Sequence, residues 1–276
     1  MRAWRAFHVV HPFPSALDAG VTGLVVVLSG GVPSRAALLG ASMLLLQFAI
    51  GAVNDWADAA ADALARPDKP IAAGLIGRAQ ALAIAVVCGL GGLGLAAVGG
   101  PALLAVGLVG LLVGLSYDLG LKATPWAWLP FAAGFTLLPL FAWLGGAGGV
   151  PPFMGWIAGL AVLAGAAVSL ANGLVDLEGD RSVARFGPAV RLGRRATLRL
   201  LLGLHLSLAA GAVASLVLAG VAGPPVWAGI ATGGALQGAG WLVSNAVSRG
   251  RRLLGWRVQA LGLATLAGAW FYGMAA

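Results

Sequence analysis

The 276-residue chain has little acidic charge and a single cysteine. Nine Asp and Glu residues stand against 17 Lys and Arg, and 60% of the residues are hydrophobic. Because Cys88 is the only cysteine, an intramolecular disulfide is excluded. The first apolar stretch follows Arg2 and Arg5, but Asp18 interrupts it and no small-x-small cleavage site follows. We therefore expect this stretch to be retained in the protein.

Long apolar runs fill most of the chain, and each can cross a hydrocarbon core of roughly 30 Å as a helix. The 44 glycines favour close packing of such helices, because small residues let membrane helices approach one another. The sequence therefore predicts an all-α integral membrane protein. We predict nine spans, over residues 14–31, 36–53, 79–98, 101–117, 126–144, 153–175, 200–221, 226–247 and 258–274.

The net charge of +8 is consistent with nucleic-acid binding until its distribution is considered. With nine spans, 16 of the 17 basic residues fall on one side of the membrane and Arg35 alone falls on the other. Such an asymmetry indicates the cytoplasmic side of a membrane protein. We therefore expect no nucleic-acid partner, a cytoplasmic N-terminus, a C-terminus outside the cytoplasm, and a location in a bacterial cell membrane.

The few acidic residues gather at the ends of three predicted spans. Because a carboxylate at a membrane edge is costly unless it is paired or holds a cation, this grouping calls for a chemical reason. Asp55, Asp58 and Asp62 are spaced i, i+3 and i+7, which places them on one face of a helix. Asp176 and Asp180 are spaced i, i+4, also on one face. Each group would present converging oxygen atoms.

The two acidic groups are copies of one pattern. Asn54-Asp55-x-x-Asp58-x-x-x-Asp62 is repeated 118 residues later as Asn172-Gly173-x-x-Asp176-x-x-x-Asp180. Each copy lies at the end of a span, and four spans separate them, which predicts an internal repeat. We expect one transmembrane domain over residues 1–276, with four-helix halves at 1–122 and 123–247 and a ninth helix at 256–276.

The chemistry of these groups favours a magnesium diphosphate site. Carboxylate oxygens are hard ligands that suit Mg²⁺, which commonly binds one or two carboxylates together with phosphate oxygens and water. Arg66, Lys69 and Lys122 follow the acidic span ends and could neutralise the remaining phosphate charge, or could act only as topology signals. Cleaving an allylic diphosphate needs such charges at one end of a site and water-poor apolar walls at the other.

Three stretches of sequence resemble the UbiA superfamily of intramembrane prenyltransferases. "NDWADAAADALARPDKPIAAG" is similar to its N-D-x-x-D-x-x-x-D motif, "SYDLGLK" to its tyrosine-and-lysine loop, and "DLEGDRSVARFGPAVRLG" to its D-x-x-x-D motif. The resemblance implies a helical bundle that binds a polyprenyl diphosphate donor through Mg²⁺. The isoprenoid tail would lie in a lipid-facing tunnel, and a hydrophobic acceptor would attack the allylic carbon.

The resemblance also implies roles for individual residues, carried over by position. The metal ligands would be Asp58, Asp62, Asp176 and Asp180, with Asp55 in support. The same four, Asp58, Asp62, Asp176 and Asp180, would be the catalytic residues. The substrate-binding residues would be Asn54, Arg66, Lys69, Tyr117, Lys122 and Asn172, although Tyr117 could equally be an interfacial anchor.

The chain departs from the family pattern at four positions. Lys69 stands where the family commonly has arginine before a proline, so a point charge replaces a bidentate group. Gly173 replaces a second aspartate that many members carry. A family glycine and a family threonine appear here as Ala184 and Gly187. The last three departures bear on the acceptor side and on the shape of the loop.

Three functions are compatible with the sequence. The first is prenyl transfer to an aromatic or lipid acceptor, and the second is a membrane terpene cyclase that ionises the same donor without an external acceptor. The third is a transporter, since repeated halves and intramembrane acids also occur there. The acids at cytoplasmic helix ends, rather than at the bilayer midplane, favour the enzymes. The sequence does not specify the acceptor or the length of the donor.

Overall fold

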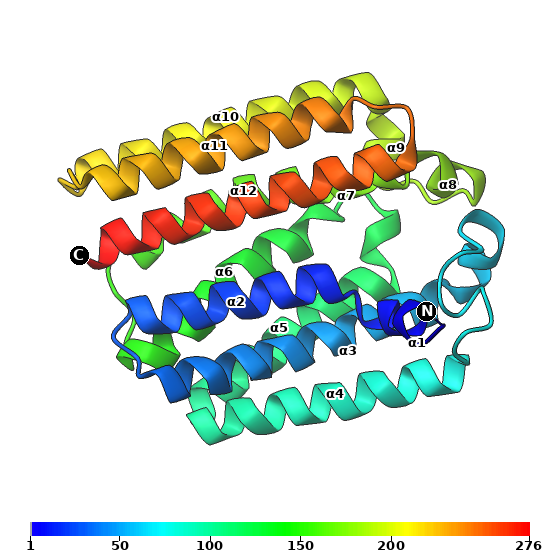
Figure 1. Ribbon diagram of the computed structural model, residues 1–276, viewed down its shortest axis with the longest axis horizontal. Coiled ribbons are helices and arrows are strands. Elements are labelled where there is room, and N and C mark those ends of the chain that lie inside the picture. The colour runs from blue at the N-terminus through cyan, green and yellow to red at the C-terminus, as the bar shows by residue number, and fades with distance from the viewer. Residues whose placement is uncertain (1) are drawn as a thin grey trace. The chain divides into compact units, whose positions relative to one another are not determined.

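The structure, a computed structural model, describes residues 2–276, and this range is helical without any strand (Figure 1). This confirms the predicted all-α class. The long helices are α2 (Pro12–Leu28), α3 (Pro33–Ala65), α4 (Arg78–Gly99), α5 (Pro101–Leu119), α6 (Trp128–Ala147), α7 (Met154–Val175), α10 (Arg194–Leu218), α11 (Pro224–Ser244) and α12 (Arg249–Ala275). The short ones are α1 (Arg2–Phe7), η1 (His8–Val10), η2 (Leu121–Ala123), α8 (Leu177–Ser182) and α9 (Pro188–Leu192).

Within residues 2–276, seven helices are long and apolar enough to cross a membrane: α3, α4, α5, α6, α7, α10 and α12. An eighth span results if residues 3–10 and α2, which are bent by 54° at His11, are counted together. Every predicted span falls on one of the long helices, including the span at α11, which does not meet the same criterion. The protein is thus a helical integral membrane protein, and the count of nine spans remains a prediction.

The chain divides into two compact units, and the boundary passes through α6. The first unit contains the chain up to Leu121 together with residues 137–149 and 182–184. Here α3 is the central helix, in contact with α2, α4 and α5, and Figure 1 shows it between α2 and α4. Ser42 of α3 is fully buried and donates a hydrogen bond to the carbonyl of Gly92 on α4, at 2.7 Å.

Helix α3 is longer than the predicted span and carries the first acidic group. Its 33 residues correspond to about 50 Å, well beyond a hydrocarbon core of roughly 30 Å. The apolar run predicted a span ending at residue 53, with the acids in the following loop, but the helix continues to Ala65. Hydropathy marks where apolar side chains stop, and the backbone remains helical because buried ion pairs support the polar last turns.

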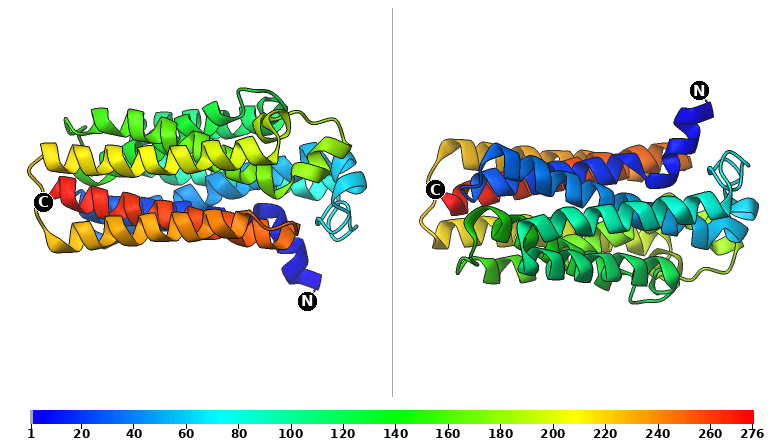
Figure 2. Two further views of the ribbon diagram at one scale, coloured as in Figure 1. Left: turned by 90° about the horizontal axis from the view of Figure 1, so that it is seen from above. Right: turned by 90° about the horizontal axis from the view of Figure 1, so that it is seen from below.

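The second unit contains residues 122–136, 150–181 and 185–276. Helix α7 contacts α10 and α12, and α11 packs along the length of α12, as Figures 1 and 2 show. Glycines make this packing close. A Cβ atom on Gly240 would lie 2.6 Å from the carbonyl oxygen of Gly255, and one on Gly262 would lie 2.8 Å from that of Gly233. The two helices pack through backbone contacts that side chains would prevent.

Candidate active site

The first acidic group lies on one buried face of α3. Asp55, Asp58 and Asp62 have exposed fractions of 1%, 4% and 1%. Their i, i+3, i+7 spacing on a continuous helix brings the three carboxylates to the same side, as the sequence predicted. Three ionisable groups so deeply buried need compensating charges close by.

Two cations from the segment after α3 supply that compensation. Arg66 Nη2 lies 2.6 Å from Asp62 Oδ1 and 3.8 Å from Asp58 Oδ2. Lys69 Nζ lies 2.8 Å from Asp55 Oδ1 and 3.1 Å from Asp62 Oδ2. Each cation therefore bridges two carboxylates. The turn in which the Lys69 N–H donates to the Arg66 carbonyl at 3.1 Å keeps both cations near the helix end.

His11 joins this group from the break before α2. Its Nε2 lies 2.9 Å from Asp55 Oδ1, although 44 residues separate them. His11 has φ 50° and ψ 61°, a left-handed conformation that is uncommon for a residue with a side chain. The sequence alone left this histidine without a role, because no local pattern links it to Asp55.

Asn54 connects α3 to the end of α5. Its Nδ2 donates to Asp118 Oδ1 at 2.6 Å, and Asp118 is only 3% exposed. Tyr117, a predicted substrate-binding residue, precedes Asp118 on the same helix and is half-buried. Within the first unit, the structure thus groups Asn54, the three aspartates and their two cations at neighbouring helix ends.

The second acidic group lies at a break between helices in the second unit. Helix α7 ends at Val175, Asp176 has φ −105° and ψ 15°, and α8 begins at Leu177. The Asp180 N–H donates to the Asp176 carbonyl at 2.8 Å, so the i, i+4 relation survives the break. Asn172, Asp176 and Asp180 are all half-buried.

One cation of the second group comes from a distant part of the chain, and another lies close by in sequence. Arg249, the first residue of α12, places Nε 2.7 Å from Asp176 Oδ1. Arg185 places Nη1 3.5 Å from Asp180 Oδ1. Lys122, the other predicted phosphate-binding residue of this unit, lies in η2 and is half-buried.

Arg252 of α12 holds the backbone around the second group. This arginine is 2% exposed. It donates from Nη1 to the Val247 carbonyl at 2.6 Å, and from Nη2 to the Val175 carbonyl at 3.2 Å and to the Glu178 carboxylate. Arg252 therefore binds residues on both sides of Asp176, namely Val175 before it and Glu178 after it. The sequence counted Arg249 and Arg252 only as topology charges, and no local signal distinguishes them from exposed Arg251.

The structure gives physical reasons for Gly173 and Gly187, but none for Ala184, whose backbone conformation favours the family's glycine. A Cβ atom at Gly173 would lie 2.8 Å from the Cβ of Ala189 on α9, so the space for a side chain is closed. A Cβ atom at Gly187 would lie 2.9 Å from the carbonyl oxygen of Lys122. Ala184 has φ 55°, a left-handed conformation that glycine adopts more readily.

The two acidic groups suit magnesium by their chemistry, although cations bridge the carboxylates of the first group in this structure. Across residues 2–276, no three His, Cys, Asp or Glu side chains form a group that could hold a metal ion, and in the first unit Arg66 and Lys69 bridge the carboxylates. The donor set nevertheless suits Mg²⁺, because it consists of hard carboxylate oxygens. One of these oxygens, Asp55 Oδ2, is buried and accepts no hydrogen bond within the described residues.

Comparison with known proteins places the chain in a family. The sequence model of the UbiA prenyltransferase family matches residues 19–252, which include both acidic groups and leave out only residues 1–18 and 253–276. The chain belongs to the UbiA prenyltransferase family. The resemblance read from the three motifs is thereby confirmed, and the protein is a prenyltransferase of this membrane family.

Individual relatives agree with this assignment. A digeranylgeranylglyceryl phosphate synthase of Methanoregula boonei is 32% identical over 235 residues, covering 82% of this chain and 78% of that protein. The apo structure of a UbiA homologue from Aeropyrum pernix K1 has a TM-score of 0.73 at 18% identity, covering 92% of this chain and 96% of the homologue.

A second solved structure carries ligands. The UbiA homologue from Archaeoglobus fulgidus bound to GPP and Mg²⁺ has a TM-score of 0.70 at 16% identity, covering 95% of this chain and 99% of the homologue. At these identities the two structural likenesses show a shared UbiA fold. The roles of the individual residues in this UbiA protein remain predictions.

Proposed function

We propose that the protein transfers a prenyl group from a polyprenyl diphosphate to a lipid acceptor within the membrane, with Mg²⁺ as cofactor. The observation that carries the proposal is the buried face of Asp55, Asp58 and Asp62 with Arg66 and Lys69 against it, in a chain of the UbiA family. The homologue bound to GPP and Mg²⁺ supports the donor class and the metal.

Each acidic group would bind Mg²⁺ and, through it, diphosphate oxygens. Bound Mg²⁺ would neutralise the charge that develops on the diphosphate as it leaves. The metal ligands proposed here are Asp58, Asp62, Asp176 and Asp180, with Asp55 in support. The groups proposed to bind the diphosphate or its oxygens are Asn54, Arg66, Lys69, Tyr117, Lys122 and Asn172.

The cations of the first group suit this task for an electrostatic reason. Arg66 and Lys69 compensate buried carboxylates in this structure, and the same donors match phosphate oxygens in charge and geometry. In the reaction the allylic C–O bond breaks and its electron pair leaves with the diphosphate. An acceptor oxygen then bonds to the allylic carbon and releases its proton. The cations lower the energy of the leaving group as its charge increases.

A lipid hydroxyl is the acceptor that the comparisons favour. The Methanoregula boonei relative is a digeranylgeranylglyceryl phosphate synthase, and its similarity extends over 82% of this chain. We therefore propose an acceptor of the glyceryl phosphate class, in preference to the aromatic ring that the sequence equally allowed.

The decisive experiment is a product analysis. Membranes containing the protein are incubated with labelled prenyl diphosphates of several lengths, with and without a glyceryl phosphate lipid, and the lipid-soluble products are identified. A prenylated lipid that requires both Mg²⁺ and the acceptor is expected. A cyclic hydrocarbon formed without an acceptor would establish the cyclase instead, and prenylation of an aromatic compound alone would overturn the lipid acceptor.

We also propose nine spans in two repeated four-helix halves, residues 1–122 and 123–247, followed by a ninth helix. The repeated motif and the 16-to-1 distribution of basic residues support this topology, with the N-terminus in the cytoplasm and the C-terminus outside. A reporter fused after Ala276 should then lie outside the cytoplasm, while a reporter inserted near Arg185 should lie inside. Both reporters on one side would refute the nine spans.

A further inference from the structure

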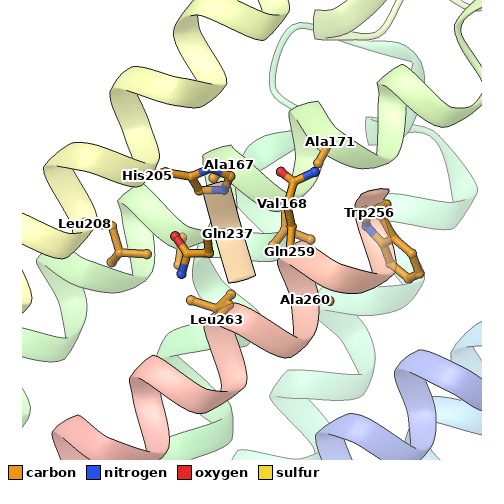
Figure 3. A pocket seen from close by; sticks show the side chains of 11 residues that line it. Ala167, Val168, Ala171, His205, Leu208, Gln237, Trp256, Gln259, Ala260 and Leu263 are labelled. Carbon is orange, nitrogen blue, oxygen red and sulfur yellow. The ribbon is translucent and has the colours of Figure 1, made fainter. Parts of the chain in front are cut away.

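A small cavity inside the second unit is lined by polar groups that the proposed reaction does not use. It lies among α7, α10, α11 and α12, and Figure 3 shows His205, Gln237 and Gln259 gathered around it. The rest of its lining is largely alanine and leucine, together with Trp256. None of the predicted active-site residues borders it.

Three side chains present buried hydrogen-bonding atoms to this cavity. Gln237 is 2% exposed, and within the described residues neither its Oε1 nor its Nε2 has a hydrogen-bond partner. His205 is 9% exposed, and its Nδ1 likewise lacks one. The same holds for Oε1 of Gln259, which is 3% exposed.

The orientation of Gln259 is set by its other atoms. Its Nε2 donates to Ser244 Oγ at 2.8 Å and to the Gly255 carbonyl at 3.1 Å, so its Oε1 is an acceptor that remains for the cavity. The cavity therefore offers two amide oxygens as acceptors, the Gln237 amide nitrogen as a donor, and an imidazole nitrogen that can play either part. The missing partner must both donate and accept hydrogen bonds.

Polar atoms without partners are especially unfavourable in this setting. The four cavity atoms lie in helices of a membrane protein, where the surrounding hydrocarbon supplies no hydrogen bonds. In folded proteins such groups are almost always satisfied by protein or by ordered water. Four atoms lining one small space are best explained by one shared partner.

The size of the cavity identifies that partner. The space open to the centre of a water-sized sphere is about 10 Å³, which is close to the minimum that holds one water molecule. We propose that the cavity is a binding site for a single water molecule that bridges α10, α11 and α12. The water donates a hydrogen bond to Oε1 of Gln237 or Gln259 and accepts one from the Gln237 amide nitrogen. It makes a further hydrogen bond with Nδ1 of His205, either as donor or as acceptor.

A structure at a resolution that shows ordered water tests the site directly. The wild-type protein in lipid nanodiscs should show one compact peak within about 3.2 Å of polar atoms from at least two of His205, Gln237 and Gln259. No peak there, in a map that shows other ordered waters, would overturn the proposal. An elongated peak would also overturn it, because it would identify a lipid or detergent chain in the cavity.

Thermal unfolding of two variants and their combination supplies a second test. His205→Leu and Gln237→Leu should each lower Tm by about 3 °C or more, since each leaves the water and the remaining residues short of a partner. Together they should lower Tm by less than the sum, because the shared water is already lost in either one. Gln47→Leu, a half-buried glutamine of α3, is the matched control and should add its own effect in full to either variant. Fully additive losses for His205 and Gln237 would show that no common partner links them.

Discussion

The two acidic groups share one spacing of aspartates but are supported in opposite ways. The first group lies on an unbroken helix and is almost fully buried. Its two main cations, Arg66 and Lys69, follow the acids that they contact by four to fourteen residues. The second lies at the α7–α8 break, is half-buried, and receives Arg249 from 73 residues away. The first copy is thus supported mainly by nearby cations, whereas Asp176 of the second copy depends on the tertiary packing of α12.

The position after the repeated asparagine shows the same contrast. In the first copy Asp55 has room for a carboxylate and contacts both His11 and Lys69. In the second copy Gly173 lies against Ala189, and a Cβ atom would approach it to 2.8 Å. A sequence repeat therefore does not guarantee that both copies have the same surroundings, because each position is also shaped by elements outside the repeat.

The largest effect is expected where the two copies should behave alike. Asp58→Asn and Asp176→Asn keep the size of the side chain and remove its charge, so each should lower turnover by about 100-fold or more. Because either substitution alone is expected to stop the donor from ionising, the double variant should be little worse than either single one. Product formation by purified protein in nanodiscs measures this.

The dependence of activity on Mg²⁺ is a second way to compare the two acidic groups. A chelator should abolish wild-type activity and added Mg²⁺ should restore it, whereas neither Asn variant should be rescued. Asp68→Asn, an exposed acid near the first group, is the control and should keep its activity. Full turnover in excess chelator would reject the magnesium proposal.

Arg252→Met should destabilise the second unit without affecting the first. It would leave the Val175 and Val247 carbonyls and the Glu178 carboxylate without this donor, at a cost of about 1–3 kcal/mol. Thermal unfolding should show the loss, and a weaker affinity for the donor diphosphate should accompany it. The adjacent and exposed Arg251→Met removes the same charge and should change neither quantity. Equal effects of the two substitutions would show that Arg252 acts only as a topology charge and does not hold the backbone around the second group.

Lys69→Ala and Lys122→Ala should each raise the KM for the donor by about tenfold. A tenfold change corresponds to about 1.4 kcal/mol of binding free energy. Lys69 belongs to the locally supported copy, where Arg66 still compensates Asp62 after the substitution, so folding should be little affected. Steady-state kinetics with varied donor concentration measures the change. Arg195→Ala, at an exposed position, is the control. Unchanged KM values in both variants would show that the two lysines do not bind the donor and act only as topology signals.

The smallest effect concerns the closed space beside Gly173. Gly173→Ala should lower the free energy of unfolding by about 1 kcal/mol, because the added methyl group meets Ala189. Ala189→Gly in the same chain should recover most of the loss by removing that contact. The double variant is therefore the informative measurement, and a loss that Ala189→Gly does not relieve would show that another contact limits this position.

Much of the fold could be predicted from hydropathy because apolar runs long enough to cross a bilayer have few alternatives to a helix. Each predicted span coincides with a helix, yet helix ends were less accessible. Helix α12 begins at Arg249, nine residues before the span predicted there. Helix α3 extends twelve residues past the end of its own predicted span. At both ends ion pairs support the polar helical residues, and the hydropathy of an apolar stretch gives no sign of such pairs.

The predicted aspartate groups were found from local spacing, and the other predicted site residues from the neighbouring motifs and the family resemblance. The residues that the sequence missed make contacts over long separations. His11 reaches Asp55 across 44 residues, and Arg252 reaches Glu178 across 74. Neither has a neighbour in the chain that reveals its role. The asparagine and aspartate spacings were visible because a helix converts i, i+3, i+4 and i+7 separations into one face without any help from the rest of the fold.

By itself, the sequence determined the helical membrane class and the repeated aspartate pattern, since these follow from hydropathy and short-range spacing, and its three motifs indicated the family by resemblance. Only the tertiary structure decided which cations compensate which acids, why Gly173 has no room for a side chain, and which buried polar atoms share the cavity at Gln237. The physical reason is that burial and ion pairing depend on which distant segments come together, and these contacts arise only when the helices pack.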